Sequence, residues 1–168
     1  MLQFKSIKEI VDWGDIIFRS VQIKQEIVEQ DPKENGLRKI LNFGHTIGHA
    51  LESHFLKTSE PLLHGEAVAW GMYAEAALSH QHNNLPAQLL KEIQEYIHLH
   101  FGLSAPQQFA MHELILNSIP ELMKWMQKDK KNVNQKISVS LLERIGFCTP
   151  DHLFSSDSLE AKLGDLLT

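Results

Sequence analysis

The stretch RKILNFGHTIGHA at residues 38–50, followed by LLHGEAVAWGM at residues 62–72, is the most informative part of this chain. Apolar residues recur at helical spacing, which predicts one helix from about residue 37 to 55 and a second from about 65 to 80. His45 and His49 lie four residues apart and therefore share one face of the first helix. A loop over residues 57–63 is long enough to fold His64 back beside them.

Three histidines at this spacing indicate a metal site. Neutral imidazole is a common zinc ligand, and a catalytic zinc takes three protein ligands and keeps one position open. Two histidines at this spacing with no third one are more often structural than ligands. Gly44 and Gly48, however, each cost about 1 kcal/mol inside a helix, which indicates that a ligand or another helix approaches the backbone closely there. Spacing alone makes both His45 and His49 ligands. Glu66 is either a further ligand or an acceptor that orients a histidine.

Polar residues around the histidines indicate an anionic substrate. Arg38 and Asn42 precede His45 and can share its helical face, and the planar arginine fork suits a carboxylate or a phosphate. Without the histidines, a solvated arginine and a structural asparagine would be the simpler interpretation. The charge run at residues 129–131 is either solvated surface or an anion site at the edge of a pocket.

The remaining sequence predicts a mainly α fold, a multi-helix bundle forming a single domain over residues 1–168. Residues 136–142 read KISVSLL and alternate, which predicts at most one short strand or extended segment. Apolar spacing near 3.6 residues predicts further helices at residues 6–30, 86–99, 109–116, 119–128 and 157–167.

Composition narrows the class of protein. The 168 residues are 43% hydrophobic and 22% charged, as is usual for a globular domain. A net charge of −5 argues against a nucleic-acid partner, and no apolar run approaches the length of a membrane span. The single cysteine, Cys148, and an N-terminus without a signal-peptide core predict a reducing cytoplasm. No glycine-rich dinucleotide fingerprint follows a strand, so we expect this chain to hold no nucleotide-binding domain.

At this point the motifs become recognisable as a family. The pattern R-x-x-L-N-F-G-H-T-x-G-H-A-x-E at residues 38–52, with L-H-G-E-A-V-A-x-G-M at 63–72, closely resembles 3-dehydroquinate synthase. Lys24, M-x-x-D-K-K at 126–131 and I-G at 145–146 fit the same family in the same order. The resemblance covers most of the chain and implies the helical, metal- and substrate-binding C-terminal domain. In the family an NAD-binding α/β domain precedes it, and we expect that domain to be absent here.

The resemblance also implies a reaction and roles for residues. The family is a carbon–oxygen lyase that closes 3-deoxy-D-arabino-heptulosonate 7-phosphate into 3-dehydroquinate with loss of phosphate. This is a step of the shikimate pathway that leads to aromatic amino acids, and it uses NAD and zinc or cobalt. By this resemblance His45 and His64 are the metal ligands, while His49 and Glu34 are catalytic and His49 takes part in proton transfer. The residues implied to bind the phosphorylated sugar acid are Lys24, Arg38, Asn42, Lys130 and Lys131. Of the two neighbouring lysines, Lys130 or Lys131 makes the contact.

Several alternatives stay open. The family's third metal ligand is a glutamate upstream of the matched region, so we expect the chain alone to be inactive and to act as a homodimer or with an NAD-binding partner domain. A related sugar-phosphate cyclase would keep most of these groups. A metal-dependent alcohol or glycerol dehydrogenase shares the histidine arrangement but has less need for Arg38 and Asn42. A non-catalytic helical interaction module would carry the histidines only as inheritance.

Overall fold

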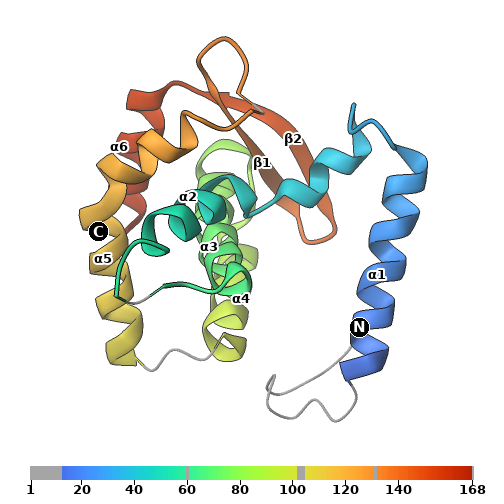
Figure 1. Ribbon diagram of the computed structural model, residues 1–168, viewed down its shortest axis with the longest axis horizontal. Coiled ribbons are helices and arrows are strands. Elements are labelled where there is room, and N and C mark those ends of the chain that lie inside the picture. The colour runs from blue at the N-terminus through green and yellow to red at the C-terminus, as the bar shows by residue number, and fades with distance from the viewer. Residues whose placement is uncertain (1–12, 60, 102–104, 131, 168) are drawn as a thin grey trace.

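The computed structural model describes residues 13–59, 61–101, 105–130 and 132–167 of the chain (Figure 1). The fold is mainly helical, as the sequence predicts, with one two-stranded sheet. Its elements, in chain order, are α1 (Trp13–Gln30), the 3-10 helix η2 (Leu37–Asn42), α2 (His45–Phe55), α3 (His64–His82), α4 (Ala87–His100), α5 (Ala105–Met126), β1 (Ile137–Arg144), β2 (Phe147–Phe154) and α6 (Ser156–Leu167).

The core forms where α2 and α3 pack together, with α5 against α2, α4 beside α3 and α6 beside α5 (Figure 1). Helix α3 lies in the middle because small side chains cover much of its surface and let its neighbours approach closely. The buried alanines of α3 are Ala67, Ala69, Ala74, Ala76 and Ala77. Larger buried side chains fill the spaces around it: Ile47, Leu51, Leu78, Leu122, Met126, Ile137, Leu141 and Leu159.

Helix α1 stands at one side of the molecule and leads into η2 (Figure 1). It confirms the predicted helix over residues 13–30, while residues 6–12 lie outside the described part. None of the α1 residues is buried, although the sequence has the apolar spacing of a packed helix. The large apolar side chains exposed along it are Trp13, Ile17, Phe18, Val21 and Ile23. In the described part of the chain, no helix combines the length and apolarity that a membrane crossing requires.

The prediction of one helix over residues 37–55 is wrong. The chain forms η2, turns, and starts again as α2 at His45. The break falls at Gly44, whose φ of 80° is a left-handed conformation that side chains rarely adopt. A Cβ atom at this position would lie only 2.3 Å from Cγ of Met72 on α3. Arg38 and Asn42 therefore do not continue the helical face of His45.

The predicted helices at 109–116 and 119–128 are one continuous helix, α5, with Pro120 inside it. An interior proline costs about 3 kcal/mol because it removes a backbone donor and crowds the preceding turn. Burial of apolar side chains on both sides of the proline offsets this cost. At helical spacing these side chains are Ile115, Ile119, Leu122, Met123 and Met126. The helices predicted at 65–80, 86–99 and 157–167 are confirmed to within two residues at each end as α3, α4 and α6.

The expectation of at most one short strand is also wrong, because β1 pairs with β2 in an antiparallel hairpin. The predicted strand corresponds to β1, where Ile137, Val139 and Leu141 are buried against the helices. Strand β2 reads FCTPDHLF and escapes prediction because its proline interrupts the alternation of apolar and polar residues. The pairing register shifts around Pro150, and Asp151 adopts a φ of 62° there.

Candidate metal and substrate site

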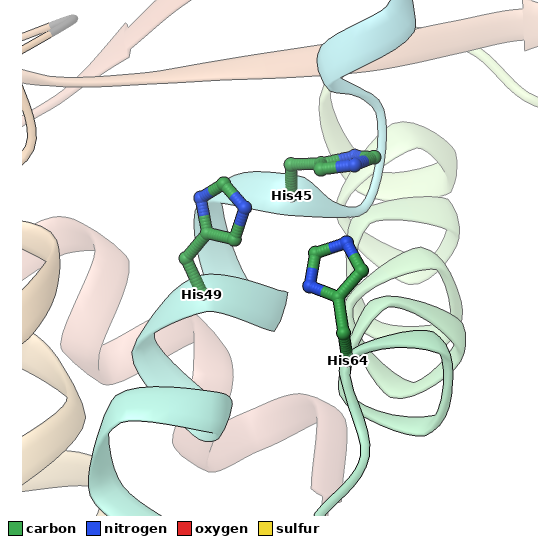
Figure 2. A group of neighbouring side chains, drawn as sticks. All are labelled: His45, His49 and His64. Carbon is green, nitrogen blue, oxygen red and sulfur yellow. The ribbon is translucent and has the colours of Figure 1, made fainter.

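His45, His49 and His64 converge on one point (Figure 2). The ring centroids lie 5.3 Å apart for His45 and His49, 5.8 Å for His45 and His64, and 5.7 Å for His49 and His64. One ring nitrogen from each histidine lies within 4.8 Å of the others. This nearly equilateral arrangement confirms the convergence that the spacing predicts, and a divalent cation with imidazole ligands fits it.

The starts of two helices place these side chains. His45 is the first residue of α2, His49 lies one turn later, and His64 is the first residue of α3. Glu66 stabilises the start of α3, since its carboxylate accepts a hydrogen bond from the Leu63 N–H at 2.9 Å. This is one half of a capping box, so Glu66 serves the helix terminus and is not the acceptor that orients a histidine.

That acceptor is Glu52, which the sequence reasoning missed. Its Oε2 lies 3.1 Å from Nδ1 of His64. Nδ1 of His45 lies 3.2 Å from the backbone oxygen of Phe43. A carboxylate and a carbonyl oxygen accept hydrogen bonds, so in both histidines Nδ1 carries a hydrogen, and in the neutral imidazole Nε2 then keeps a lone pair for a metal. Glu52 could have been found by position, since it lies three residues after His49 on the same helix.

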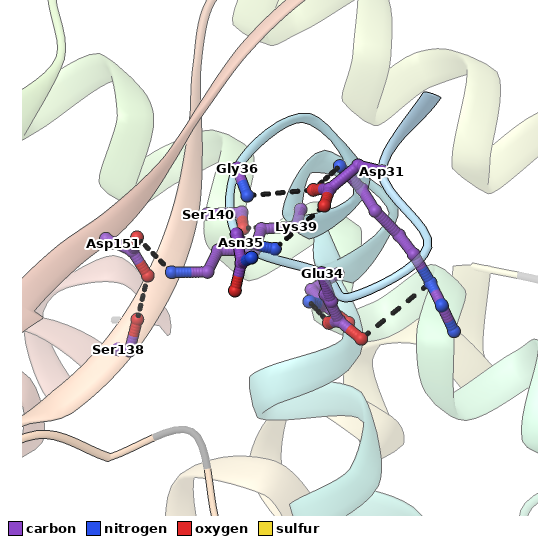
Figure 3. Close-up of polar contacts among 10 residues, drawn as sticks. Asp31, Glu34, Asn35, Gly36, Lys39, Ser138, Ser140 and Asp151 are labelled. Carbon is purple, nitrogen blue, oxygen red and sulfur yellow. Dashed lines mark hydrogen bonds and ion pairs between the residues drawn. The ribbon is translucent and has the colours of Figure 1, made fainter. Parts of the chain in front are cut away.

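A polar cluster centred on Glu34 precedes α2 in the chain (Figure 3). Asn42 donates a hydrogen bond from Nδ2 to Oε1 of Glu34 at 2.8 Å, and Nε of Arg38 lies 3.8 Å from Oε2 of the same residue. The guanidinium also donates to the Pro32 carbonyl at 3.1 Å. Three of the predicted site residues are therefore brought together, but through Glu34 and not along one helical face.

The loop that presents Glu34 is organised by Asp31 (Figure 3). Its carboxylate accepts hydrogen bonds from the N–H groups of Asn35 at 2.9 Å, Gly36 at 2.8 Å and Arg38 at 3.1 Å. These donors stabilise the ionised form and hold the pKa of Asp31 below its ordinary value. Glu34 itself has a φ of 56°, which the closed loop imposes on it.

Two adjoining pockets, which share Thr46 and Lys130, lie at His49 and at this cluster. A pocket of about 280 Å³ is lined by Glu34, Asn42, Thr46 and Lys130 together with residues of the hairpin. A second pocket of about 400 Å³ is lined by His49, Glu52, Thr46 and Lys130 together with the end of α5. Lys130 and Thr46 line both pockets. Lys130 therefore lies between the pocket of Glu34 and the pocket of His49, the two residues predicted to be catalytic.

Among the other predicted substrate residues, Arg38 and Lys24 line neither pocket, and Lys24 is exposed on α1. Lys131 lies outside the described residues. The hairpin supplies a group that the sequence did not indicate. Lys39 pairs with Asp151 at 2.6 Å and both line the smaller pocket, with Ser138 Oγ lying 3.4 Å from the same carboxylate (Figure 3). No sequence signal indicated this pair, because β2 was not predicted.

A comparison with protein families decides the relationship. Residues 3–132 match the family described as 3-dehydroquinate synthase C-terminal. The chain belongs to this family. The 3-dehydroquinate synthase of Parabacteroides distasonis is 40% identical over 79% of the chain, and that of Clostridium botulinum is 35% identical over 86%. The pentafunctional AROM polypeptide of Kluyveromyces lactis is 38% identical over 89% of the chain and matches over 10% of its own length.

The chain spans 35% and 39% of the length of the two bacterial enzymes. Among solved structures, 2-deoxy-scyllo-inosose synthase in complex with carbaglucose-6-phosphate, NAD+ and Co2+ superposes with a TM-score of 0.67 at 20% identity. The match covers 89% of this chain and 39% of that one. At that identity the likeness shows the shared fold.

Proposed function

We propose that this chain is the metal- and substrate-binding half of a 3-dehydroquinate synthase. The complete enzyme would cyclise 3-deoxy-D-arabino-heptulosonate 7-phosphate to 3-dehydroquinate with loss of phosphate. The observation that carries the proposal is the convergence of three histidines, of which His49 lines a pocket that shares Thr46 and Lys130 with the pocket of Glu34 and Asn42. Family membership and the relatives named above support the same reaction.

In this proposal His45 and His64 hold a divalent zinc or cobalt ion through Nε2, and a glutamate outside this chain supplies the third protein ligand. The hydrogen bonds at Nδ1 of both histidines support this assignment. When bound, the ion would act as a Lewis acid on a substrate oxygen. His49 is not a ligand in this proposal and is therefore available for proton transfer. Its ring centroid lies 5.3 Å from that of His45 and 5.7 Å from that of His64.

Glu34 is the second proposed catalytic residue, and it also positions Asn42 and Arg38. Lys130 lines both pockets and is placed to neutralise a phosphate or a carboxylate between them. Lys24 and Lys131 complete the proposed substrate set. NAD would bind mainly in a separate NAD-binding domain, and the chain would act with that partner domain or as a homodimer. We place the protein in the cytoplasm because its relatives are biosynthetic enzymes.

The alternatives are less well supported. A cyclase that forms a different ring would retain these groups, but the relatives at 35–40% identity are 3-dehydroquinate synthases. A dehydrogenase does not need the Glu34–Asn42 pair. A purely structural module does not need the Glu52–His64 contact.

Reconstitution tests the proposal. The chain is mixed with the separately expressed NAD-binding domain of the Parabacteroides distasonis enzyme, NAD and Zn²⁺, and phosphate release from the heptulosonate phosphate is measured. We expect turnover in the mixture, none from either part alone, and none with His64→Ala. Turnover by the chain alone would disprove the need for a partner. A stable, metal-loaded mixture without turnover would disprove the function.

A further inference from the structure

A buried carboxylate that the proposed reaction does not use contacts the first turn of α2. Glu75, on α3, is 0% exposed. Its Oε2 accepts a hydrogen bond from the Gly44 N–H at 2.5 Å, and its Oε1 accepts one from the Ile47 N–H at 3.3 Å. Burying a carboxylate is costly without such donors, so these bonds are needed to keep the group inside.

The two donors belong to the start of α2. The first N–H groups of a helix have no partner within the helix, and Gly44, at the N-cap, has no side chain to accept from them. Glu75 provides from a neighbouring helix the acceptors that a serine or aspartate cap would provide locally. Its negative charge also lies at the positive end of the α2 dipole, where it is stabilising.

Glycines allow the two helices to approach closely enough for this contact. A Cβ at Gly71 would lie 1.9 Å from the Gly44 oxygen, and a Cβ at Gly48 would lie 2.9 Å from Cα of Val68. Gly71 and Glu75 are four residues apart on the same face of α3. The face of α3 that touches the start of α2 therefore also delivers the carboxylate.

The contact joins the two helices that carry the proposed ligands. His45 lies between the donors Gly44 and Ile47 at the start of α2, and His64 begins α3, the helix that carries Glu75. We propose that Glu75 is a positioning residue that fixes the first turn of α2 relative to α3 and thereby holds His45 opposite His64. This inference rests on the proposed metal site, and it concerns a residue that contacts neither metal nor substrate.

Cobalt binding by the 168-residue chain tests this inference. Glu75→Gln keeps the shape and one acceptor, but its amide NH2 faces a backbone donor. We expect about 10-fold weaker Co²⁺ binding or more, a changed visible absorption spectrum of the bound Co²⁺, and faster exchange of the Gly44 and Ile47 amides. Glu92→Gln on the exposed side of α4 is the matched control and should leave all three unchanged.

The possible outcomes distinguish a failure of the positioning role from a failure of the metal site. Wild-type affinity and spectrum in Glu75→Gln would overturn the positioning role and leave the metal site intact. A wild-type chain that binds no Co²⁺, either alone or in the reconstituted mixture, would overturn the metal site together with the positioning role. If Glu75→Gln does not fold, Glu75→Asp keeps the charge but withdraws it by one methylene. The same loss of affinity is then expected, and an unchanged affinity would overturn the positioning role.

Discussion

The carboxylate of Glu52 lies 3.1 Å from Nδ1 of His64, and this contact links α2 to the first residue of α3. Glu52 lies on the same helix as His45 and His49, so one helix provides two histidines and orients the third. The Nδ1 hydrogen of His64 points to Glu52, which leaves Nε2 directed toward the other rings.

We expect Glu52→Gln to weaken zinc binding about 10-fold to 100-fold, because an amide is a poorer acceptor and no longer fixes the His64 tautomer. A competition titration with a chromogenic chelator measures the affinity. Glu66→Gln is the control, because Glu66 caps α3 and does not contact His64. Equal zinc affinities for wild type and Glu52→Gln would show that the contact is incidental.

Single alanine substitutions distinguish two ligands from three. In the proposed site His45→Ala and His64→Ala lose stoichiometric zinc binding, because each removes one of the two ligands that the chain supplies. His49→Ala keeps zinc within a few-fold of the wild-type affinity but abolishes turnover in the reconstituted mixture. Isothermal titration calorimetry and the phosphate-release assay provide these measurements. If His49→Ala loses zinc as fully as the other two, the chain uses all three histidines as ligands.

Acid should loosen the loop that presents Glu34. The pKa of Asp31 is held below its ordinary value by backbone donors, so its stabilising contribution is present above about pH 4, the pKa of an unfolded aspartate, and is lost as the pH falls through the folded value. We expect the amide NMR signals of Asn35 and Gly36 to shift together below about pH 4. In Asp31→Asn this titration should be missing, and its persistence would assign it to another group.

Cys148 should react slowly with alkylating reagents. Burial, with a smaller contribution from the charge of Glu75, raises the pKa of its thiol to about 11. At pH 8 the reactive thiolate is then on the order of 100-fold scarcer than in an unhindered cysteine with a pKa near 8.5. Iodoacetamide labelling followed by mass spectrometry measures the rate, with the chain unfolded in urea as the reference. Similar rates in both states would contradict the raised pKa.

Gly44→Ala should destabilise the fold by about 1–3 kcal/mol, because the new Cβ would strain the left-handed backbone and meet Met72. Gly65→Ala is the matched control on α3, since a Cβ there would have no atom within 4 Å. Urea unfolding followed by circular dichroism gives both values. Equal free energies of unfolding for the two variants would show that the contact between α2 and α3 adapts at low cost.

The sequence predicted those features that depend on local spacing. The convergence of His45 with His49 follows from helical periodicity, and a short loop is sufficient to return His64. The break at Gly44 could not be predicted, because it depends on the contact with Met72, 28 positions along the chain. The sequence draws attention to Glu66 because it lies beside His64, although a glutamate in the first turn of a helix is typical of a cap.

Strand β2 was missed for a related reason. The proline and the register shift at Asp151 remove the alternation by which strands are recognised, and β1 is what specifies the pairing. The sequence therefore could not predict that the hairpin lines the smaller pocket or that Lys39 pairs with Asp151 there. The mainly α class was predictable because most segments have one clear apolar periodicity.

The separation of contacts along the chain has a consequence for the order of folding. Glu52 and His64 are 12 residues apart, whereas Lys39 and Asp151 are 112 residues apart. Closing the longer loop costs about 2 kcal/mol more chain entropy, and contacts of long range form late. We expect the histidine cluster to assemble while the hairpin is still undocked. If the proposed function holds, a nascent chain would then be able to bind a divalent cation at the three histidines before the smaller pocket has a complete wall.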